Sequence, residues 1–129
     1  MLVVDASVLA PFVADFESDG PRIRARLRGQ QLSGPAIVKF ETQSVLRRHV
    51  LAGSLDAVAA ERAVAALERV PIATYPAEPF LGRMWELRHS VTTYDACYVA
   101  LAEVLDAVLL TGDRRLAGAR GPECQIELA

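Results

Sequence analysis

The sequence predicts an α/β fold in which helices cover both faces of a central parallel sheet. Short apolar runs typical of buried strands alternate along the chain with longer stretches of helical periodicity. Acidic residues follow two of these runs, Asp5 after the first and Asp113 after the run at 107–110, where ligands bind in such sheets. With 129 residues, 52% of them hydrophobic, the chain can form a normal core, and we expect a single domain over residues 1–129.

The first part of the chain predicts two strands and three helices. In order, they are a strand at 2–5, helices at 7–14 and 19–29, a strand at 31–33 and a helix at 34–52. Asp19 is placed to cap the second helix, and Pro21 suits its first turn, where a missing N–H costs nothing. Gly34-Pro35 is expected to begin the third helix, which Gly53 ends.

The second part predicts three more strands and three helices. In order, they are a helix at 54–70, a strand at 71–75, helices at 79–88 and 92–105, a strand at 107–110 and a weak strand at 125–128. Pro71 ends the first of these helices. Thr111-Gly112-Asp113 has the composition of a turn. Met84 and Trp85 are expected to pack in the core.

Composition and charge restrict the class of protein. No apolar run approaches the roughly 18 residues of a membrane span, and no signal peptide is evident, so we expect no membrane partner. Cys97 and Cys124 lack C-x-x-C spacing and are expected to be free thiols of a cytoplasmic protein. The net charge of −2 argues against a general nucleic-acid coat protein, but it does not exclude an enzyme with an acidic site.

Four acidic residues are the candidate site, and each has a structural alternative. They are Asp5, Glu41, Asp95 and Asp113. Asp5 and Asp113 could each cap a helix, which is worth about 1 kcal/mol. Asp95 could form a capping box with Thr92. Glu41 shares a helix face with Val38 and Val45, where an unpaired charge is costly, and Arg48 is its candidate ion-pair partner.

Gathered in one place, the four acids would favour a divalent cation. Two unit charges about 4 Å apart repel by about 4 kcal/mol at an effective dielectric of about 20. Without a cation, such a cluster takes up protons. A hard cation such as Mg²⁺ or Mn²⁺ prefers oxygen ligands and removes the repulsion. If the acids do not converge, the capping alternatives stand.

The segments around these acids resemble a known family. They are Leu2-Val3-Val4-Asp5-Ala6-Ser7, Phe40-Glu41, Thr93-Tyr94-Asp95-Ala96-Cys97-Tyr98 and Leu110-Thr111-Gly112-Asp113-Arg114-Arg115-Leu116. In this order and spacing they resemble the PIN-domain ribonucleases, and within them the VapC-type toxins of toxin–antitoxin modules. The resemblance extends over the whole chain, and the segments of Asp95 and Asp113 are the most specific.

The resemblance implies a three-layer α/β/α sandwich with a parallel sheet of about five strands. It also implies an Mg²⁺- or Mn²⁺-dependent endoribonuclease that cuts transfer, ribosomal or messenger RNA. By the family pattern, Asp5 and Asp95 would be the main metal ligands, Asp113 a ligand or a support for the ligands, and Glu41 would act through metal-bound water.

Other residues near the acids gain candidate roles from the same resemblance. Ser7 and Thr111 match small hydroxyl residues that line the family's pocket, with capping as the alternative. Arg114 and Arg115 follow the fourth acid, where some members carry a further acid. Because they adjoin Asp113, they are candidate contacts for RNA phosphates, with a solvated helix face as the alternative. Since His49 and His89 are far from the acidic motifs in sequence, we expect them in the surface or core. Without a histidine pair for a metal-free route, we expect products with 5′-phosphate and 3′-hydroxyl ends.

The resemblance further implies a homodimer and a cognate antitoxin that places a basic side chain in the acidic pocket. Four apolar residues could line the antitoxin's groove, with core burial as the alternative: Phe12, Phe16, Leu51 and Leu55.

Two other classes of protein are open. A receiver-type or phosphatase-type phosphoryl-transfer domain also gathers acids around Mg²⁺, but here a single acid follows the first strand and Lys39 is the only lysine. A non-catalytic interaction module of the same fold is the second, and the presence of all four acids weighs against it.

Overall fold

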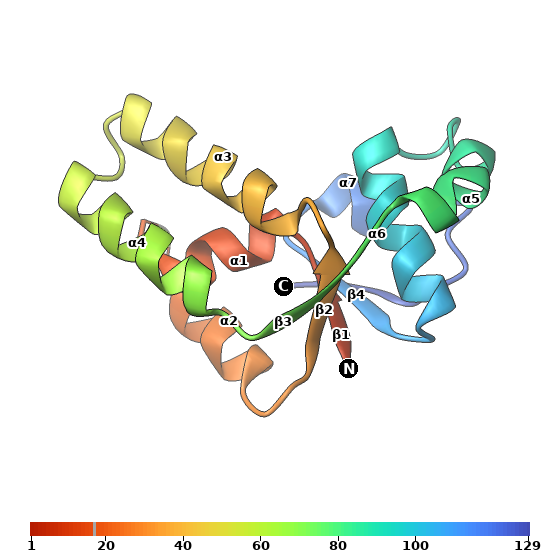
Figure 1. Ribbon diagram of the computed structural model, residues 1–129, viewed down its shortest axis with the longest axis horizontal. Coiled ribbons are helices and arrows are strands. Elements are labelled where there is room, and N and C mark those ends of the chain that lie inside the picture. Colours follow the sequence, from red (N-terminus) through yellow and green to blue (C-terminus); the bar gives the residue numbers. More distant parts are fainter. Residues whose placement is uncertain (17) are drawn as a thin grey trace.

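The computed structural model describes residues 1–16 and 18–129, and its centre is a parallel sheet of five strands. The strands are β1 (Leu2–Val4), β2 (Leu32–Pro35), β3 (Ile72–Tyr75), β4 (Val108–Thr111) and β5 (Ile126–Leu128), in the spatial order β3-β2-β1-β4-β5. The chain builds outward from β1 to β3, then returns to the other side of β1 with β4 (Figure 1). The strand order therefore reverses between β1 and β4, and a ligand crevice is expected at their carboxyl ends.

Helices cover both faces of this sheet. They are α1 (Ala6–Val13), α2 (Gly20–Leu27), α3 (Val38–Leu51), α4 (Ala57–Arg69), the 3-10 helix η1 (Glu78–Phe80), α5 (Leu81–Glu86), α6 (Thr93–Val104) and α7 (Arg114–Ala117). In Figure 1, α1 to α4 lie on one side of the sheet and α5 and α6 on the other. The predicted α/β sandwich and its five parallel strands are confirmed. Across residues 1–16 and 18–129, no helix is long and apolar enough to cross a membrane.

The core lies against the central strands and α6. Val3 and Val4 of β1 and Leu109 and Leu110 of β4 are completely buried, as expected for central parallel strands covered on both faces. Helix α6 is buried over the whole range 96–102, which includes three alanines that let it pack close to the sheet. Burying each of the larger side chains contributes about 2 kcal/mol.

Helices α3 and α4 form an antiparallel hairpin that projects beyond the sheet (Figure 1). Gly53 follows α3 with φ of +78°, a left-handed conformation that favours glycine. Asp56 then caps α4 by accepting a 2.8 Å hydrogen bond from the N–H of Ala59. Leu46 and Leu55 pack in a small apolar cluster of their own at this hairpin.

One predicted helix start and one predicted helix cap are wrong. Gly34-Pro35 does not begin a helix, because β2 continues through both residues to pair with Thr74 and Tyr75 of β3, and α3 begins only at Val38. Asp19 occupies the N-cap position of α2 but makes no capping hydrogen bond with its side chain. Its carboxylate instead accepts a 3.1 Å hydrogen bond from Arg22.

Three expectations near the C-terminal half also change. Thr111 is the last residue of β4 rather than part of the turn, and it pairs with Leu128 of β5. A short helix, α7, follows Asp113; it was not among the predicted elements, although helix capping was the structural alternative for Asp113. Met84 is buried as expected, but Trp85 is 68% exposed and does not belong to the core.

Candidate active site

Asp5 is fixed at the carboxyl end of β1 by two hydroxyl groups. Because Val4 pairs with Leu110, the next residues, Asp5 and Thr111, lie side by side at the edge of the sheet. Thr111 Oγ1 donates to Asp5 Oδ2 and Ser7 Oγ donates to Oδ1, each at 2.5 Å. Asp5 makes no side-chain cap of α1, although it occupies the N-cap position. The capping alternative is therefore wrong for Asp5.

Ser7 ties the start of α1 to the turn that carries Asp113. Its Oγ accepts a 2.7 Å hydrogen bond from the N–H of Gly112, and Thr111 Oγ1 accepts one of 3.0 Å from the N–H of Asp113. A Cβ atom on Gly112 would lie 3.1 Å from Ser7 Oγ and 3.3 Å from Ser7 Cβ. Glycine thus permits the close approach that these hydrogen bonds need.

Glu41 is held by a tyrosine of α6. The hydroxyl of Tyr98, a side chain only 2% exposed, donates a 2.6 Å hydrogen bond to Glu41 Oε1. Burial and this carboxylate both raise the pKa of Tyr98, so the phenol stays protonated and remains a donor. Arg48 takes part in no ion pair among the described residues, and the alternative of a Glu41–Arg48 pair is wrong.

Asp95 and Asp113 stand at the starts of two helices. Thr92 caps α6 by accepting a 3.1 Å hydrogen bond from the N–H of Asp95, which is half the predicted capping box. Asp113 caps α7 by accepting a 2.8 Å hydrogen bond from the N–H of Arg115, so the capping alternative is confirmed for this residue. Capping occupies one carboxylate oxygen of Asp113 and leaves the other available.

All four acids line one cavity of about 370 Å³ at the carboxyl edge of the sheet, which we call the acidic cavity. They come from four separated segments: the end of β1, the first turn of α3, the first turn of α6 and the turn after β4. The other lining residues are Ala6, Ser7, Ser44, Val45, Arg48 and Tyr98. The fold therefore brings together the four acids that the sequence predicted as a group.

Burial and mutual repulsion raise the pKa of two of these acids. Burial raises the pKa of Asp5, the hydrogen bonds from Ser7 and Thr111 lower it, and the charge of Asp95 raises it again. Burial also raises the pKa of Asp95, opposed by its hydrogen bond with Thr92 and reinforced by the charge of Asp113. A cation in the acidic cavity would remove this repulsion and favour the ionised carboxylates.

The chemistry of the acidic cavity fits a hard divalent cation. The polar groups that line it carry oxygen, apart from the guanidinium of Arg48, and neither histidine nor cysteine is among the lining residues. Within the part of the chain that the structure describes, no three Asp, Glu, His or Cys side chains are close enough to enclose an ion. The carboxylates would therefore have to draw closer together to coordinate one.

Two arginines and one histidine line cavities together with the acids. Arg48 lines the acidic cavity, and Arg115 lines an adjoining cavity together with Asp95, Asp113 and His89. His49 lines a third cavity that Ser7 also borders. His89 is exposed, as expected, but the segment before α6 places it in one cavity with Asp95 and Asp113, so the expectation that it is remote from the acidic motifs is wrong. The cavity of His49 includes none of the four acids.

Tyr98 is the residue at the site that the sequence analysis missed. It lies three residues after Asp95, which at helical spacing places it on the same face of α6. A phenol on the face that carries a candidate site acid is the signal that would have identified it, because a buried hydroxyl needs a hydrogen-bond partner.

Comparison of the sequence with known proteins gives consistent matches over the whole chain. Residues 2–121 match the PIN domain family. The chain is 41% identical over 130 residues to Ribonuclease VapC1 of Mycobacterium tuberculosis, covering 98% of this chain and 96% of that protein. It is 36% identical over 126 residues to Ribonuclease VapC9 of the same organism, again over 98% of this chain and 96% of the relative.

Solved structures with low sequence identity share the fold. The crystal structure of Mycobacterium tuberculosis VapC20, a sarcin-ricin loop cleaving toxin, matches with a TM-score of 0.70 at 18% identity, over 92% of this chain and 96% of that one. The crystal structure of PAE2754 from Pyrobaculum aerophilum matches with a TM-score of 0.66 at 24% identity, over 89% and 81% of the two chains. With its order of acidic motifs, its strand order and these sequence identities, the chain belongs to the PIN-domain family and, within it, to the VapC-type ribonuclease toxins.

Proposed function

We propose that this VapC-type ribonuclease is a metal-dependent endoribonuclease that hydrolyses RNA phosphodiesters in the acidic cavity. The observation that carries the proposal is the lining of one cavity by Asp5, Glu41, Asp95 and Asp113, which come from four separated segments. Burial and repulsion oppose ionisation of Asp5 and Asp95, and a bound cation would offset both effects by stabilising the ionised carboxylates.

Asp5, Asp95 and Asp113 would hold the cation, which is Mg²⁺ or Mn²⁺ in this proposal. When bound, the cation would make water more acidic and stabilise negative charge on the phosphoryl oxygens. Ser7 and Thr111 fix the carboxylate of Asp5 at the end of β1, so this ligand is oriented before substrate arrives.

Glu41 is the proposed general base. Tyr98 occupies Oε1 of Glu41, which leaves Oε2 free to accept a proton from the attacking water. Hydrolysis would break the bond between phosphorus and the 3′-oxygen, leaving 5′-phosphate and 3′-hydroxyl ends. A 2′,3′-cyclic phosphate product would instead indicate attack by the 2′-hydroxyl, and His89, which shares the adjoining cavity with Asp95 and Asp113, would then be the candidate base.

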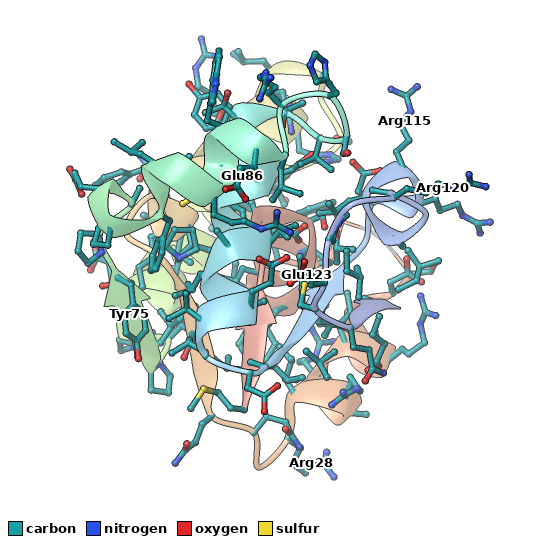
Figure 2. The ribbon with its side chains drawn as sticks, turned by 90° about the vertical axis from the view of Figure 1, so that its right-hand side faces the viewer. Arg28, Tyr75, Glu86, Arg115, Arg120 and Glu123 are labelled. Carbon is teal, nitrogen blue, oxygen red and sulfur yellow. The ribbon has the colours of Figure 1, made fainter. Side chains whose placement is uncertain are left out.

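RNA would be held by positive charge at the rim of the acidic cavity. Arg48 lines this cavity, and Arg114 and Arg115 begin the helix that Asp113 caps. In Figure 2, Arg115 extends outward from the edge of the molecule, where a large substrate can reach it. The proposed substrates are transfer, ribosomal or messenger RNA.

A cognate antitoxin is the proposed protein partner, in a module that also includes a homodimer of this chain. An arginine or lysine of the antitoxin placed in the acidic cavity would neutralise the carboxylates that otherwise hold the cation.

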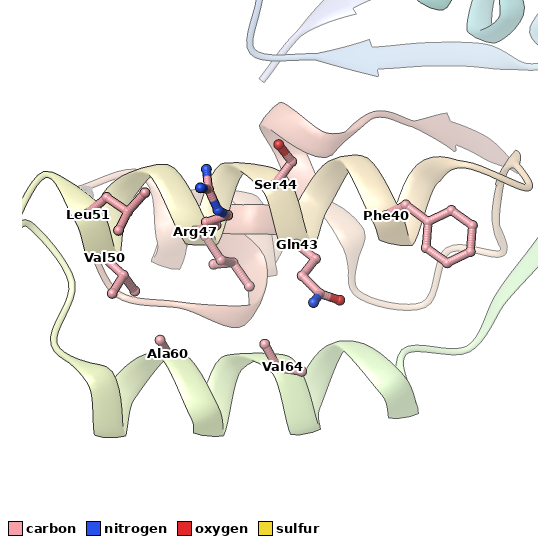
Figure 3. A pocket seen from close by; sticks show the side chains of 9 residues that line it. Phe40, Gln43, Ser44, Arg47, Val50, Leu51, Ala60 and Val64 are labelled. Carbon is pink, nitrogen blue, oxygen red and sulfur yellow. The ribbon is translucent and has the colours of Figure 1, made fainter.

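The four apolar residues considered for the antitoxin's groove differ in exposure, and Phe16 packs against the small apolar cluster that contains Leu55. Leu55 is buried and Phe12 and Phe16 are partly buried, whereas Leu51 is 69% exposed, so the alternative of core burial is wrong for Leu51. Leu51 lines a groove of about 560 Å³ between α3 and α4, with Phe40 at the opposite end (Figure 3).

The proposed activity is tested by incubating the purified protein with total RNA in Mn²⁺, Mg²⁺ or EDTA and mapping the new 5′ ends. We expect cuts at a few positions, abolished by EDTA and by Asp95→Asn. Cleavage that persists in Asp95→Asn at the wild-type rate would contradict the assigned role. Size-exclusion chromatography, alone and with the product of the adjacent reading frame, tests the homodimer and the antitoxin.

A further inference from the structure

A second cavity, of about 450 Å³, adjoins the acidic cavity and shares Asp95 and Asp113 with it. Its lining also includes Arg88 and His89, which follow α5, and Arg115 of α7. The two shared carboxylates thus have acidic neighbours on one side and basic side chains on the other. We call this second cavity the Arg88–Arg115 groove.

The arginines of this groove are positioned but not neutralised. Arg88 Nη1 donates a 2.9 Å hydrogen bond to the carbonyl of Trp85, and its guanidinium carbon lies 4.8 Å from the centre of the Trp85 ring. Neither Arg88 nor Arg115 takes part in an ion pair among the described residues. A guanidinium has five N–H donors, so Arg88 keeps several for an anion.

Arg115 is placed by the same turn that presents Asp113. Its N–H donates to the Asp113 carboxylate, and its side chain is exposed and extends outward from α7 (Figure 2). Arg115 therefore lies only two residues from Asp113, beside any RNA strand that passes Asp113 to enter the acidic cavity.

We propose that the Arg88–Arg115 groove binds the phosphate backbone of RNA next to the bond that is cleaved; this inference rests on the proposed function. RNA that enters a cavity lined by four carboxylates meets repulsion, and a protein of net charge −2 has no general positive field to offset it. Two free guanidiniums beside the acids supply local attraction for the flanking phosphates. Trp85 is 68% exposed beside Arg88 and offers a ring on which an unpaired base can stack.

The groove is tested with the double variant Arg88→Gln/Arg115→Gln. The matched control is Arg62→Gln/Arg69→Gln, which removes the same charge from exposed residues of α4 that take part in no ion pair within residues 1–16 and 18–129. The probe is a short fluorescein-labelled single-stranded RNA of mixed sequence, and fluorescence anisotropy in EDTA gives Kd from about 50 to 200 mM salt. Since each phosphate contact adds about 0.7 to the slope of log K against log salt, the groove variant should lose about 1.4 of slope.

We expect Kd to rise several-fold in the groove variant and to stay near the wild-type value in the control. Arg88→Lys/Arg115→Lys should keep the wild-type salt slope because it keeps both charges. The single variant Arg115→Gln leaves the packing of Arg88 on Trp85 intact. Its salt slope should fall by about 0.7, half of the decrease expected for the double variant. Equal weakening in the groove variant and the control, or no weakening in either, would overturn the proposal.

Cleavage assays on the same proteins separate this inference from the proposed function. A wild-type protein that binds the RNA through the groove but cuts no RNA with any metal would contradict the proposed activity alone. A wild-type protein that cleaves, with an unchanged KM in the groove variant, would contradict the groove alone.

Discussion

The hydroxyl of Tyr98 donates a 2.6 Å hydrogen bond to Oε1 of Glu41, which joins α6 to α3 at the wall of the acidic cavity. The two residues are 57 positions apart in the sequence. One oxygen of Glu41 is therefore fixed by a buried donor, and the direction of the other oxygen is fixed with it. In this arrangement Tyr98 positions the proposed base.

Replacing Tyr98 by Phe removes this hydrogen bond and keeps the ring. We expect kcat for RNA cleavage to fall by about tenfold to a hundredfold, because a base displaced by about 1 Å loses that much. KM should change little. Stability should fall by about 1–2 kcal/mol in urea unfolding, because the carboxylate loses a buried partner.

The control is Tyr94→Phe, at an exposed tyrosine 64% accessible on the same helix. A Tyr98→Phe protein that keeps the wild-type kcat would show that Tyr98 serves packing alone.

Replacing Asp95 should change how the thermal stability of the protein responds to a divalent cation, as well as its activity. Its pKa is raised in the folded protein, so its contribution to stability is lost as the pH rises through the folded pKa. At neutral pH the ionised, partly buried Asp95 therefore destabilises the fold, and Asp95→Asn removes this charge. In EDTA at neutral pH we expect the Tm of Asp95→Asn to equal or exceed that of the wild type.

Adding Mn²⁺ should reverse this order. Mn²⁺ raises the Tm of the wild type by mass action, and Asp95→Asn should gain much less. Glu61→Gln, on the exposed face of α4, is the control and should respond as the wild type does. An equal Mn²⁺-induced shift in Asp95→Asn and the wild type would rule out Asp95 as a ligand.

Gly112→Ala should damage the site more than the fold. The added Cβ would lie 3.1 Å from Ser7 Oγ, so Ser7 must shift by a few tenths of an ångström, which disturbs its hydrogen bonds with Asp5 and with the N–H of residue 112. We expect a loss of about 1–3 kcal/mol in stability and a larger proportional loss of kcat. Gly82→Ala, in α5 with nothing within 4 Å of the added Cβ, should be neutral or stabilising. Equal kcat in the two variants would contradict the role given to Ser7.

An ion pair away from the site should control acid stability. Arg83 donates two hydrogen bonds, of 2.8 and 3.1 Å, to the carboxylate of Glu103, and the N–H of Glu123 donates a third of 2.8 Å. Burial raises the pKa of Glu103, but these hydrogen bonds and the charge of Arg83 outweigh it and lower the pKa overall. Arg83 also lies 3.1 Å from Glu86 and 3.9 Å from Glu123, and both glutamates are labelled on this face in Figure 2.

Because the folded pKa of Glu103 is lowered, its stabilisation is present above the unfolded pKa of about 4.3 and is lost as the pH falls through the folded value. Glu103→Gln should lose about 2 kcal/mol at neutral pH and show a flatter decline in stability below about pH 4. Urea unfolding at a series of pH values measures both. A decline as steep as in the wild type would contradict the assignment.

The sequence was sufficient to predict the fold class because the strand signals are strong. Runs such as Leu2–Val4 and 107–110 are apolar throughout, and the alternation with helices admits few topologies. The boundaries that were wrong depend on tertiary pairing. Gly34 and Pro35 have the composition of a helix start, and only the presence of β3 beside them makes them strand.

The same limit applies to the site. The sequence predicted that Asp5 and Asp113 would meet at one edge, since both follow central strands, and the structure places them in one cavity. It did not predict the hydrogen bond between Glu41 and Tyr98 or the position of His89 beside Asp95, because each depends on how two distant segments pack.

Anomalous diffraction from crystals soaked in Mn²⁺ tests the central claim most directly. The acidic cavity predicts a manganese peak within coordination distance of Asp5 and Asp95, with carboxylates drawn closer together than in the metal-free protein. Crystals that show no peak among Asp5, Glu41, Asp95 and Asp113, at Mn²⁺ concentrations that support RNA cleavage in solution, would contradict it.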